Sequence, residues 1–340
     1  MRREDVVADA GDVGARLRSM ADLATPMAVR VAATLRIADH IARGRRTASE
    51  LAEAVNADVD ALDRVLRHLT TVGVLSRDRS GRYALTALGD ALRDEHPHRL
   101  RARLDLDGAV GRADLSFVRL LHTVRTGEPA YAAQFSQSFW EDLSTHAALS
   151  ASFDALMGSD VAMEAPAIVS AYNWGSLGHV VDVGGGNGSL LIALLTAYPA
   201  LRGTVVDLPG TADAARKALK AAGFADRSAV VAGSFFDPLP PGAGGYLLSA
   251  IIHNWDDEAV RTILRRCADA AGIDGAVFVV ERMGADGQSP STERDLRMLA
   301  YFGGRERGLA ELTALAADAR LRVAAVHAAG VNSIVELTAL

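Results

Sequence analysis

The chain has 340 residues, 49% of them apolar, so it is long enough for two domains with buried cores. Its formal net charge of −6 at pH 7 argues against a protein whose main task is to bind nucleic-acid phosphates. The single cysteine, Cys267, excludes an internal disulfide framework, and no apolar run reaches the roughly 18 residues of a membrane span. These features predict a cytoplasmic protein with no membrane partner, in which Cys267 is a small buried side chain on a helix.

The first part of the chain, residues 1–100, has the pattern of a small helical domain with a hairpin. Thr47 and Glu50 have the spacing of a capping box that opens a short helix. A second helix follows, with one apolar face formed by Leu62, Val65, Leu66 and Leu69. Apolar pairs at 74–75 and 83–85 then flank a polar turn, which indicates a hairpin. Two short helices before a hairpin predict a winged-helix arrangement.

A winged helix either binds DNA or serves as a dimerisation module. The second helix carries two Asp, two Arg and one His within residues 60–68. A recognition helix normally has an unbalanced basic face. We therefore expect a dimerisation module without a nucleic-acid partner, and a DNA-binding regulator is the alternative.

Residues 101–170 continue the helical pattern as a linker segment that is a candidate for the acceptor pocket. Its aromatic and methionine side chains recur at helical spacing, at Trp140, Phe153 and Met157 among others. Such side chains form a core more often than they line a ligand site. Both interpretations stay open on the sequence alone.

From residue 171 to residue 340 short apolar runs alternate with helical stretches. β-branched runs separated by helices predict a parallel sheet covered on both faces, so the fold class is α/β. The runs lie at 180–183, 205–206, 230–231, 246–252, 276–280, 321–326 and 333–337.

A glycine-rich loop follows the first of these strands. It contains Asp182, Gly184, Gly186 and Gly188, and it precedes an apolar helix. Glycines at this point let the backbone approach a cofactor closely. A dinucleotide fingerprint needs a glycine where Ser189 stands, so the loop fits a nucleoside cofactor that lacks a pyrophosphate. A tight turn without a ligand is the alternative.

Polar residues end the next two strands. Asp207 stands about 20 residues beyond the glycine loop, where a carboxylate holds a ribose diol. Ser234 and Phe235 follow the third strand, where a polar group and an aromatic ring suit an adenine, or where the phenylalanine simply joins the core.

The fourth strand ends in Ser249, followed by His253, Asn254 and Trp255. Open α/β sheets bind ligands at this edge, which makes His253 a candidate base and Trp255 a candidate wall of the cofactor site. Glu281 ends the fifth strand and Glu306 comes later; either carboxylate is a candidate to orient an imidazole or is a solvated charge.

With these elements in order, the chain resembles the small-molecule O-methyltransferases of the caffeic-acid and acetylserotonin type, including their bacterial natural-product branch. The resemblance covers nearly the whole length. It implies a Rossmann-like class I methyltransferase sheet of seven strands and an N-terminal all-α winged-helix-like domain that joins two subunits in a homodimer. It also implies S-adenosylmethionine as the cofactor, S-adenosylhomocysteine as its product, and a small aromatic acceptor.

The resemblance further assigns roles to residues. It implies His253 as the base, flanked by Glu281 and Glu306, and it places Asn254, Met298 and the three residues of the helical segment near the acceptor. The cofactor residues that it implies, with those of the glycine loop, are Asp182, Gly184, Gly186, Asp207, Leu208, Ser234, Phe235, Ser249 and Trp255.

The chain departs from the family pattern at a few positions. Ser234 and Asn254 stand where most relatives carry aspartate, and the loop at 300–302 is one residue shorter than in plant members. The first change predicts a weaker or water-mediated hold on the cofactor. The last leaves the shape of the acceptor site open.

The resemblance implies direct displacement: an acceptor oxygen attacks the methyl group while His253 takes its proton. Related enzymes without the histidine hydroxylate or decarboxylate instead, which is the alternative chemistry, and N- or C-methylation is a further one. We expect no metal. The alternative is Mg²⁺ held by Asp256 and Asp257, which otherwise cap and begin the next helix.

Overall fold

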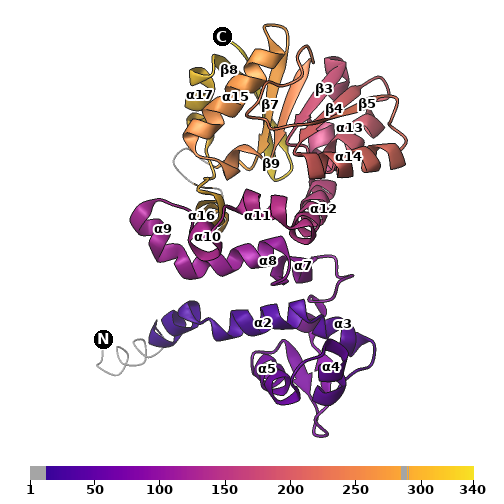
Figure 1. The fold of residues 1–340 in the computed structure, drawn as a ribbon, viewed down its shortest axis with the longest axis vertical. Coiled ribbons are helices and arrows are strands. Elements are labelled where there is room, and N and C mark those ends of the chain that lie inside the picture. Colours follow the sequence, from indigo (N-terminus) through magenta and orange to yellow (C-terminus); the bar gives the residue numbers. More distant parts are fainter. Residues whose placement is uncertain (1–12, 285–288, 290) are drawn as a thin grey trace, which may run out of the picture. The chain divides into compact units, whose positions relative to one another are not determined.

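The computed structural model describes residues 13–284, 289 and 291–340. The described chain forms two compact units that divide after Arg112 (Figure 1). Each unit has its own hydrophobic core. Within the described ranges no helix is long and apolar enough to cross a membrane. The three-part division at residues 100 and 170 stays a prediction.

The first unit contains the predicted pair of helices and hairpin. The capping box is confirmed, because Thr47 Oγ1 accepts from Glu50 N at 3.3 Å and Glu50 Oε2 accepts from Thr47 N at 2.8 Å. The Tyr83 hydroxyl, on the hairpin, donates to Asp63 of α5 (Val59–Thr71) at 2.7 Å. The elements are α2 (Ala24–Thr34), α3 (Ile37–Ala42), α4 (Ala48–Val55), α5 (Val59–Thr71), β1 (Leu75–Arg77), β2 (Tyr83–Leu85), α6 (Ala87–Asp90) and α7 (Leu100–Leu104).

The second unit begins with a helical segment, as the sequence predicts. Its longest element, α12, has 25 residues and carries Pro166 inside it. The elements, starting with the helix that contains the division, are α8 (Ala109–Asp114), η1 (Leu115–Arg119), α9 (Leu120–Thr126), α10 (Ala130–Phe135), α11 (Phe139–Thr145), α12 (Ala147–Ala171) and η2 (Trp174–Leu177).

The rest of the second unit is a seven-stranded sheet with strand order β5-β4-β3-β6-β7-β9-β8. Its strands are β3 (His179–Val183), β4 (Arg202–Asp207), β5 (Ser228–Ala232), β6 (Gly245–Ser249), β7 (Ala276–Glu281), β8 (Leu321–Ala329) and β9 (Asn332–Ala339). The intervening helices are α13 (Ser189–Ala197), α14 (Pro209–Ala221), η3 (Ile252–Asn254), α15 (Asp257–Ala271), α16 (Thr292–Phe302) and α17 (Leu309–Asp318).

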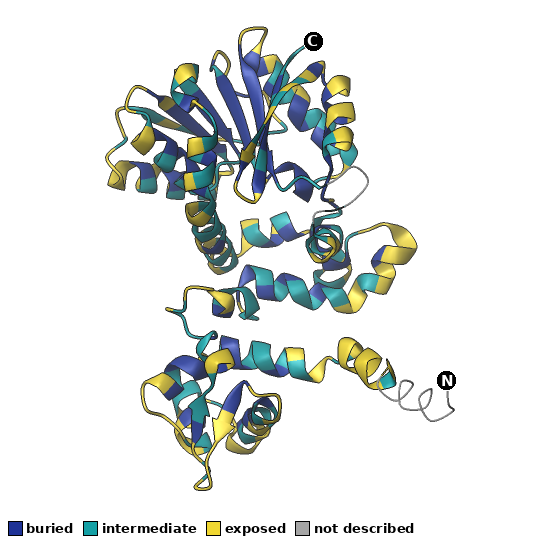
Figure 2. Ribbon diagram, turned by 180° about the vertical axis from the view of Figure 1, so that it is seen from behind, coloured by how far each residue is buried: buried dark blue, intermediate teal, exposed yellow. Residues whose placement is uncertain are grey.

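Helices cover both faces of the sheet, which explains why its strands are apolar at successive positions. Val181 packs into the core shared with α15 and α17, whereas its neighbour Val180 packs into the core shared with α12, α13 and α14. All six residues of β7 are buried, and Figure 2 shows the central strands as the buried layer. Cys267 is fully buried on α15, as predicted, and burial raises the pKa of its thiol.

Two details differ from the predicted sheet. β3 to β7 pair in parallel, but β9 pairs antiparallel with both β7 and β8. The reason is that only Gly330 and Val331 connect β8 to β9, and so short a turn joins antiparallel strands. The apolar run at 246–252 is also shorter as a strand: β6 ends at Ser249, because Ala250 has a φ of 55°.

Candidate active site

The glycine loop after β3 has the backbone conformation that glycine favours. Gly184 has a φ of 70° and Gly186 a φ of 58°. A Cβ added at Gly184 would lie 2.6 Å from Ile251 Cδ1, whereas one at Gly186 would meet no atom within 4 Å. Gly184 is therefore favoured by its positive φ and by the nearby Ile251 side chain, while the loop at Gly186 faces open space.

Asp207, at the end of β4, is bound to the glycine loop. Its Oδ2 accepts from Gly186 N at 2.8 Å, and its Oδ1 accepts from Leu208 N at 2.7 Å. Burial raises the pKa of this carboxyl, and the two backbone donors oppose that rise. Asp207 thus lies beside the loop where the sequence predicts it, and the Leu208 side chain is half-exposed next to it.

Two further carboxyl groups, those of Asp182 and Asp154, lie close enough to Asp207 to interact with its charge. Asp182 is 1% exposed, and its Oδ2 has no hydrogen-bond partner among the described residues. Burial, with a contribution from Asp207, raises the pKa of Asp182 to about 7 and that of Asp154, on α12, to about 6. Each of the three carboxyl groups is therefore protonated more readily than a free carboxyl, and a positive charge nearby would favour its ionised form. No pattern in the sequence pointed to Asp154, because a single acidic residue on a helix usually faces solvent.

The residues predicted to clasp a nucleobase lie at the same edge of the sheet. Ser234 Oγ accepts from Phe236 N at 3.2 Å, so this hydroxyl also stabilises its own turn. Phe235 Cε1 would lie 3.3 Å from a Cβ added at Gly184, which places the ring beside the glycine loop. Ser249 ends β6 and is half-buried.

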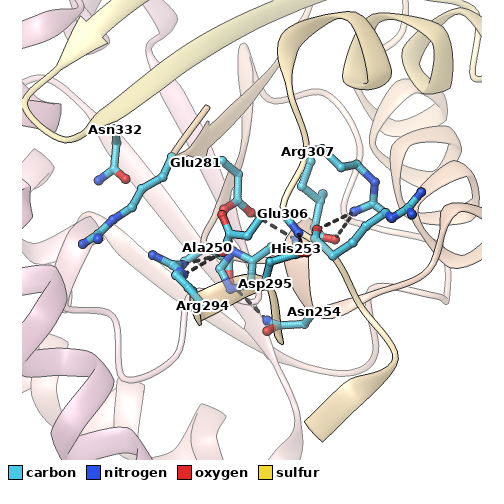
Figure 3. Close-up of polar contacts among 12 residues, drawn as sticks. Ala250, His253, Asn254, Glu281, Arg294, Asp295, Glu306, Arg307 and Asn332 are labelled. Carbon is cyan, nitrogen blue, oxygen red and sulfur yellow. Dashed lines mark hydrogen bonds and ion pairs between the residues drawn. The ribbon is translucent and has the colours of Figure 1, made fainter. Parts of the chain in front are cut away.

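His253 lies in η3, directly after β6, and is paired with Glu281 at the end of β7 (Figure 3). His253 Nδ1 is 2.5 Å from Glu281 Oε2, and the backbone N–H of His253 donates to Glu281 Oε1 at 3.4 Å. Both residues are buried. Because a carboxylate only accepts, a neutral imidazole in this contact carries its proton on Nδ1 and keeps the Nε2 lone pair.

Glu306 makes its contact with Arg294, a residue that the sequence did not single out. Glu306 Oε1 forms an ion pair with Arg294 Nε at 2.7 Å, and Arg294 Nη2 is 3.3 Å from His253 Nδ1. Burial raises the pKa of the Glu306 carboxyl, and Arg294 and then His253 oppose that rise. The spacing of these residues along the sequence could not show that Arg294 contacts both Glu306 and the imidazole. The predicted orienting role of Glu306 stays a prediction.

Arg307 holds the turn that carries His253. Its buried guanidinium donates to Ile252 O at 2.8 Å, to Trp255 O at 2.7 Å and to Asp257 Oδ1 at 2.8 Å. A Cβ added at Gly304 would lie 2.2 Å from His253 O, so the loop between α16 and α17 also packs closely on the turn that carries His253. The hydrogen bonds and the ion pair of Arg307 therefore fix the conformation of this turn.

Asp256 and Asp257 cap and begin α15, the roles that the sequence analysis set against Mg²⁺ binding. Asp256 caps α15, accepting from Ala259 N at 2.8 Å, and Asp257 pairs with Arg307. In the described part of the chain, no three His, Cys, Asp or Glu side chains gather as a metal site would require. Asn254, the other polar residue of the turn, is buried and donates to Ala250 O at 3.3 Å.

Aromatic side chains form a continuous cluster that includes Trp255, two residues after His253. The Trp140 ring stacks on Trp255 at 6.0 Å and on Phe302 at 5.2 Å, with 15° between planes in both pairs. Phe153 contacts Trp140 at 5.9 Å, and Trp255 contacts Phe235 at 5.8 Å between ring centroids. Met157 is half-buried on α12 and Met298 is buried on α16. Residues predicted for the acceptor site and residues predicted for the cofactor site thus contact one another in one aromatic wall, which also contains Phe302. Residues 300–302 were predicted as a loop, but they end the helix α16.

Comparison with known proteins identifies the two units. Residues 117–322 match the model of an O-methyltransferase domain, and residues 17–94 match that of an O-methyltransferase dimerisation domain.

Individual relatives match nearly end to end. The chain is 57% identical over 324 residues to 2,7-dihydroxy-5-methyl-1-naphthoate 7-O-methyltransferase of Streptomyces carzinostaticus, covering 95% of this chain and 97% of that protein. It is 47% identical over 343 residues to aclacinomycin 10-hydroxylase RdmB of Streptomyces purpurascens, covering 97% and 91%.

Solved structures agree with the fold. The crystal structure of NcsB1, an O-methyltransferase from neocarzinostatin biosynthesis in complex with S-adenosylmethionine and 2-hydroxy-5-methyl naphthoic acid, is 57% identical and superposes with a TM-score of 0.92. The match covers 95% of this chain and 98% of that one. The predicted class I methyltransferase fold with an N-terminal dimerisation domain is confirmed, and the chain belongs to the O-methyltransferase family.

Proposed function

We propose that the chain, an S-adenosylmethionine-dependent O-methyltransferase, methylates a phenolic hydroxyl of an aromatic, polyketide-type molecule such as a hydroxynaphthoate, with His253 as the general base. The observation that carries this proposal is the buried pair of His253 and Glu281, whose Nδ1 and Oε2 atoms are 2.5 Å apart at the carboxyl edge of the sheet. The relative that is 57% identical methylates a dihydroxynaphthoate, which supports the substrate class.

The cofactor site that we propose lies along the carboxyl edge of β3, β4, β5 and β6. S-adenosylmethionine, when bound, supplies an electrophilic methyl group on a positively charged sulfur. Asp207 would accept from a ribose, and the open backbone at Gly186 leaves room for close approach. The remaining residues of this site would be Asp182, Gly184, Leu208, Ser234, Phe235, Ser249 and Trp255.

His253 would remove the phenolic proton. A phenol has a pKa near 10, so almost none is ionised at neutral pH and a base must act as the oxygen attacks. Nε2 is the free nitrogen, because Glu281 holds the proton on Nδ1. The same carboxylate stabilises the imidazolium that forms.

The aromatic wall would hold the acceptor in line with the methyl group. Flat rings such as Trp140 and Phe153 stack on a flat aromatic substrate, and orientation of this kind contributes much of the acceleration of a direct displacement. Met157, Met298 and Asn254 would complete the acceptor site.

We propose that the chain acts as a homodimer through its dimerisation domain. Leu17, Met20 and Leu23 recur along one stretch of this unit with 67%, 76% and 66% of their surface exposed. An exposed apolar stripe of this kind marks a protein contact. Analytical ultracentrifugation tests the proposal, and replacing these three residues by serine should give a monomer.

Hydroxylation is the second candidate, because a relative that is 47% identical is a hydroxylase. The intact pair of His253 and Glu281 favours methyl transfer, since that chemistry needs a base at this position. Mass spectrometry of products from hydroxynaphthoates and S-adenosylmethionine separates the two. Methylation adds one CH₂ unit, whereas hydroxylation adds one oxygen and decarboxylation removes CO₂.

A further inference from the structure

We propose that Glu306 acts on His253 only through Arg294, a positioning residue whose guanidinium it anchors beside Nδ1 so that this nitrogen stays paired with Glu281. The inference rests on the proposed function, in which His253 is the base. It concerns the three charged side chains around one imidazole: Glu281 on β7, Arg294 on α16 and Glu306 in the loop before α17 (Figure 3).

Two groups compete for the same nitrogen of His253. Nδ1 lies 2.5 Å from Glu281 Oε2, which can only accept a hydrogen bond, and 3.3 Å from Arg294 Nη2, which can only donate one. Nδ1 therefore serves one of them at a time. Pairing with Glu281 puts the proton on Nδ1 and leaves Nε2 as a base. Pairing with Arg294 would put the proton on Nε2, where it blocks proton removal from the acceptor.

Glu306 decides this competition by holding Arg294. Its side chain is 1% exposed, and it binds Arg294 Nε at 2.7 Å, on the edge of the guanidinium beside Nη2. With this carboxylate in place, the guanidinium is anchored and its charge is balanced. Without it, Arg294 is a cation that lacks its partner carboxylate and closes on Nδ1, which it already contacts at 3.3 Å. A closer contact there breaks the pair that keeps Nε2 free.

Further charges face the ring or line the small cavity beside it. Asp295, on α16, accepts from the backbone N–H of Glu306 at 2.8 Å. Arg282, Arg305 and Arg307 line the cavity together with His253, Glu281 and Glu306. Arg307 is bound to the backbone of the turn and Arg282 to Glu164, which leaves Arg294 as the cation with a contact to the imidazole in the described structure.

The test is a double-mutant cycle of Glu306→Gln and Arg294→Met, measured as kcat across pH. Glu306→Gln should lower kcat by about tenfold to a hundredfold, a part of the roughly 10²- to 10⁴-fold that a positioned base contributes. It should also move the acid limb of the profile to lower pH, because an unbalanced cation beside the ring opposes its protonation. The double variant should recover to within about threefold of the wild type, with the acid limb restored.

The matched control is Arg305→Met in the Glu306→Gln background. It removes a cation from the same cavity, but one whose side chain has no contact with the imidazole or Glu306 in the described structure, so it should not rescue turnover. Calorimetry with S-adenosylhomocysteine and thermal melting establish that each variant folds. A purely structural ion pair would change the melting temperature without moving the acid limb.

Two results would overturn the inference. If the double variant is as slow as Glu306→Gln alone, Glu306 acts on the imidazole directly. If Glu306→Gln keeps wild-type kcat, it has no role in turnover. The His253→Ala variant separates these failures from a failure of the proposed function: wild-type turnover in that variant rejects the base assignment itself.

Discussion

The indole rings of Trp140 and Trp255 are stacked, with centroids 6.0 Å apart and planes 15° from parallel. Trp140 belongs to α11 and Trp255 to the turn after β6, so the stack joins the helical segment to the edge of the sheet. The proposed acceptor wall and the proposed cofactor wall therefore share one aromatic layer. Replacing one of these rings should change KM for both the acceptor and the cofactor, but not equally.

Trp140→Ala should raise KM for a naphthoate-type acceptor about tenfold or more, while KM for S-adenosylmethionine changes by less than about threefold. Removing one stacked ring forfeits roughly 1 kcal/mol or more of aromatic contact. Trp140→Phe keeps a flat ring and serves as the matched control. Equal increases in both KM values would show that Trp140 supports the fold and not the acceptor site.

His253→Ala should bind S-adenosylhomocysteine like the wild type but lose turnover by a factor of about 10² to 10⁴, because no other group would take the phenolic proton. Glu281→Gln should lose activity as well, since an amide can donate to Nδ1 and so stabilise the wrong tautomer. Single-turnover kinetics with calorimetry check both. A variant of His253 with unchanged kcat contradicts the base assignment.

Arg307→Met should destabilise the protein and slow turnover together. Loss of the guanidinium leaves the carbonyl groups of Ile252 and Trp255 without their donor and Asp257 without its ion pair, a cost of roughly 3 kcal/mol for a buried partner. Arg307→Lys keeps the charge but cannot make these contacts at once. The melting temperature should be highest for the wild type, lower for Arg307→Lys and lowest for Arg307→Met. Identical melting temperatures would show that the Arg307 contacts do not stabilise the turn.

Asp182→Asn should stabilise the cofactor-free protein more at pH 8 than at pH 5. Burial raises the pKa of this carboxyl from 3.8 to about 7, so the folded state holds its proton more tightly than the unfolded state. Wild-type stability is then highest below pH 3.8 with respect to this group and falls as pH rises to about 7. Asparagine removes this loss.

The gap in melting temperature between Asp182→Asn and the wild type should reach a few degrees at pH 8, given about 1.4 kcal/mol per pKa unit as an upper bound. Differential scanning calorimetry at several pH values measures it. A gap that does not change with pH would mean that Asp182 is already ionised at little cost in the fold.

Turnover should be unaffected by EDTA. Asp256 caps α15 and Asp257 pairs with Arg307, so both carboxylates are engaged by the protein. Activity assays before and after exhaustive chelation, with Mg²⁺ added back, make the comparison. A loss that Mg²⁺ restores would bring back the cation-dependent alternative.

The sequence by itself determined the local elements and the order of the motifs. The capping box at Thr47 and the apolar face of α5 are local signals, because a cap and a helix face depend on residues within a few positions. The place of the glycine loop and of Asp207 at strand ends followed in the same way. Such patterns also carried the resemblance to the methyltransferase family, which the comparisons confirm.

Only the tertiary structure decided which charge faces which. His253 follows β6 and Glu281 ends β7, its parallel neighbour, so the sheet brings them together across 28 positions of sequence. Glu306 comes from a loop and Arg294 from a helix, and no periodicity relates the two. The stack of Trp140 on Trp255 and the acidic group of Asp154 depend likewise on how α11 and α12 pack on the sheet. Contacts of this kind follow from the packing of whole elements, which a single sequence does not encode in any local spacing.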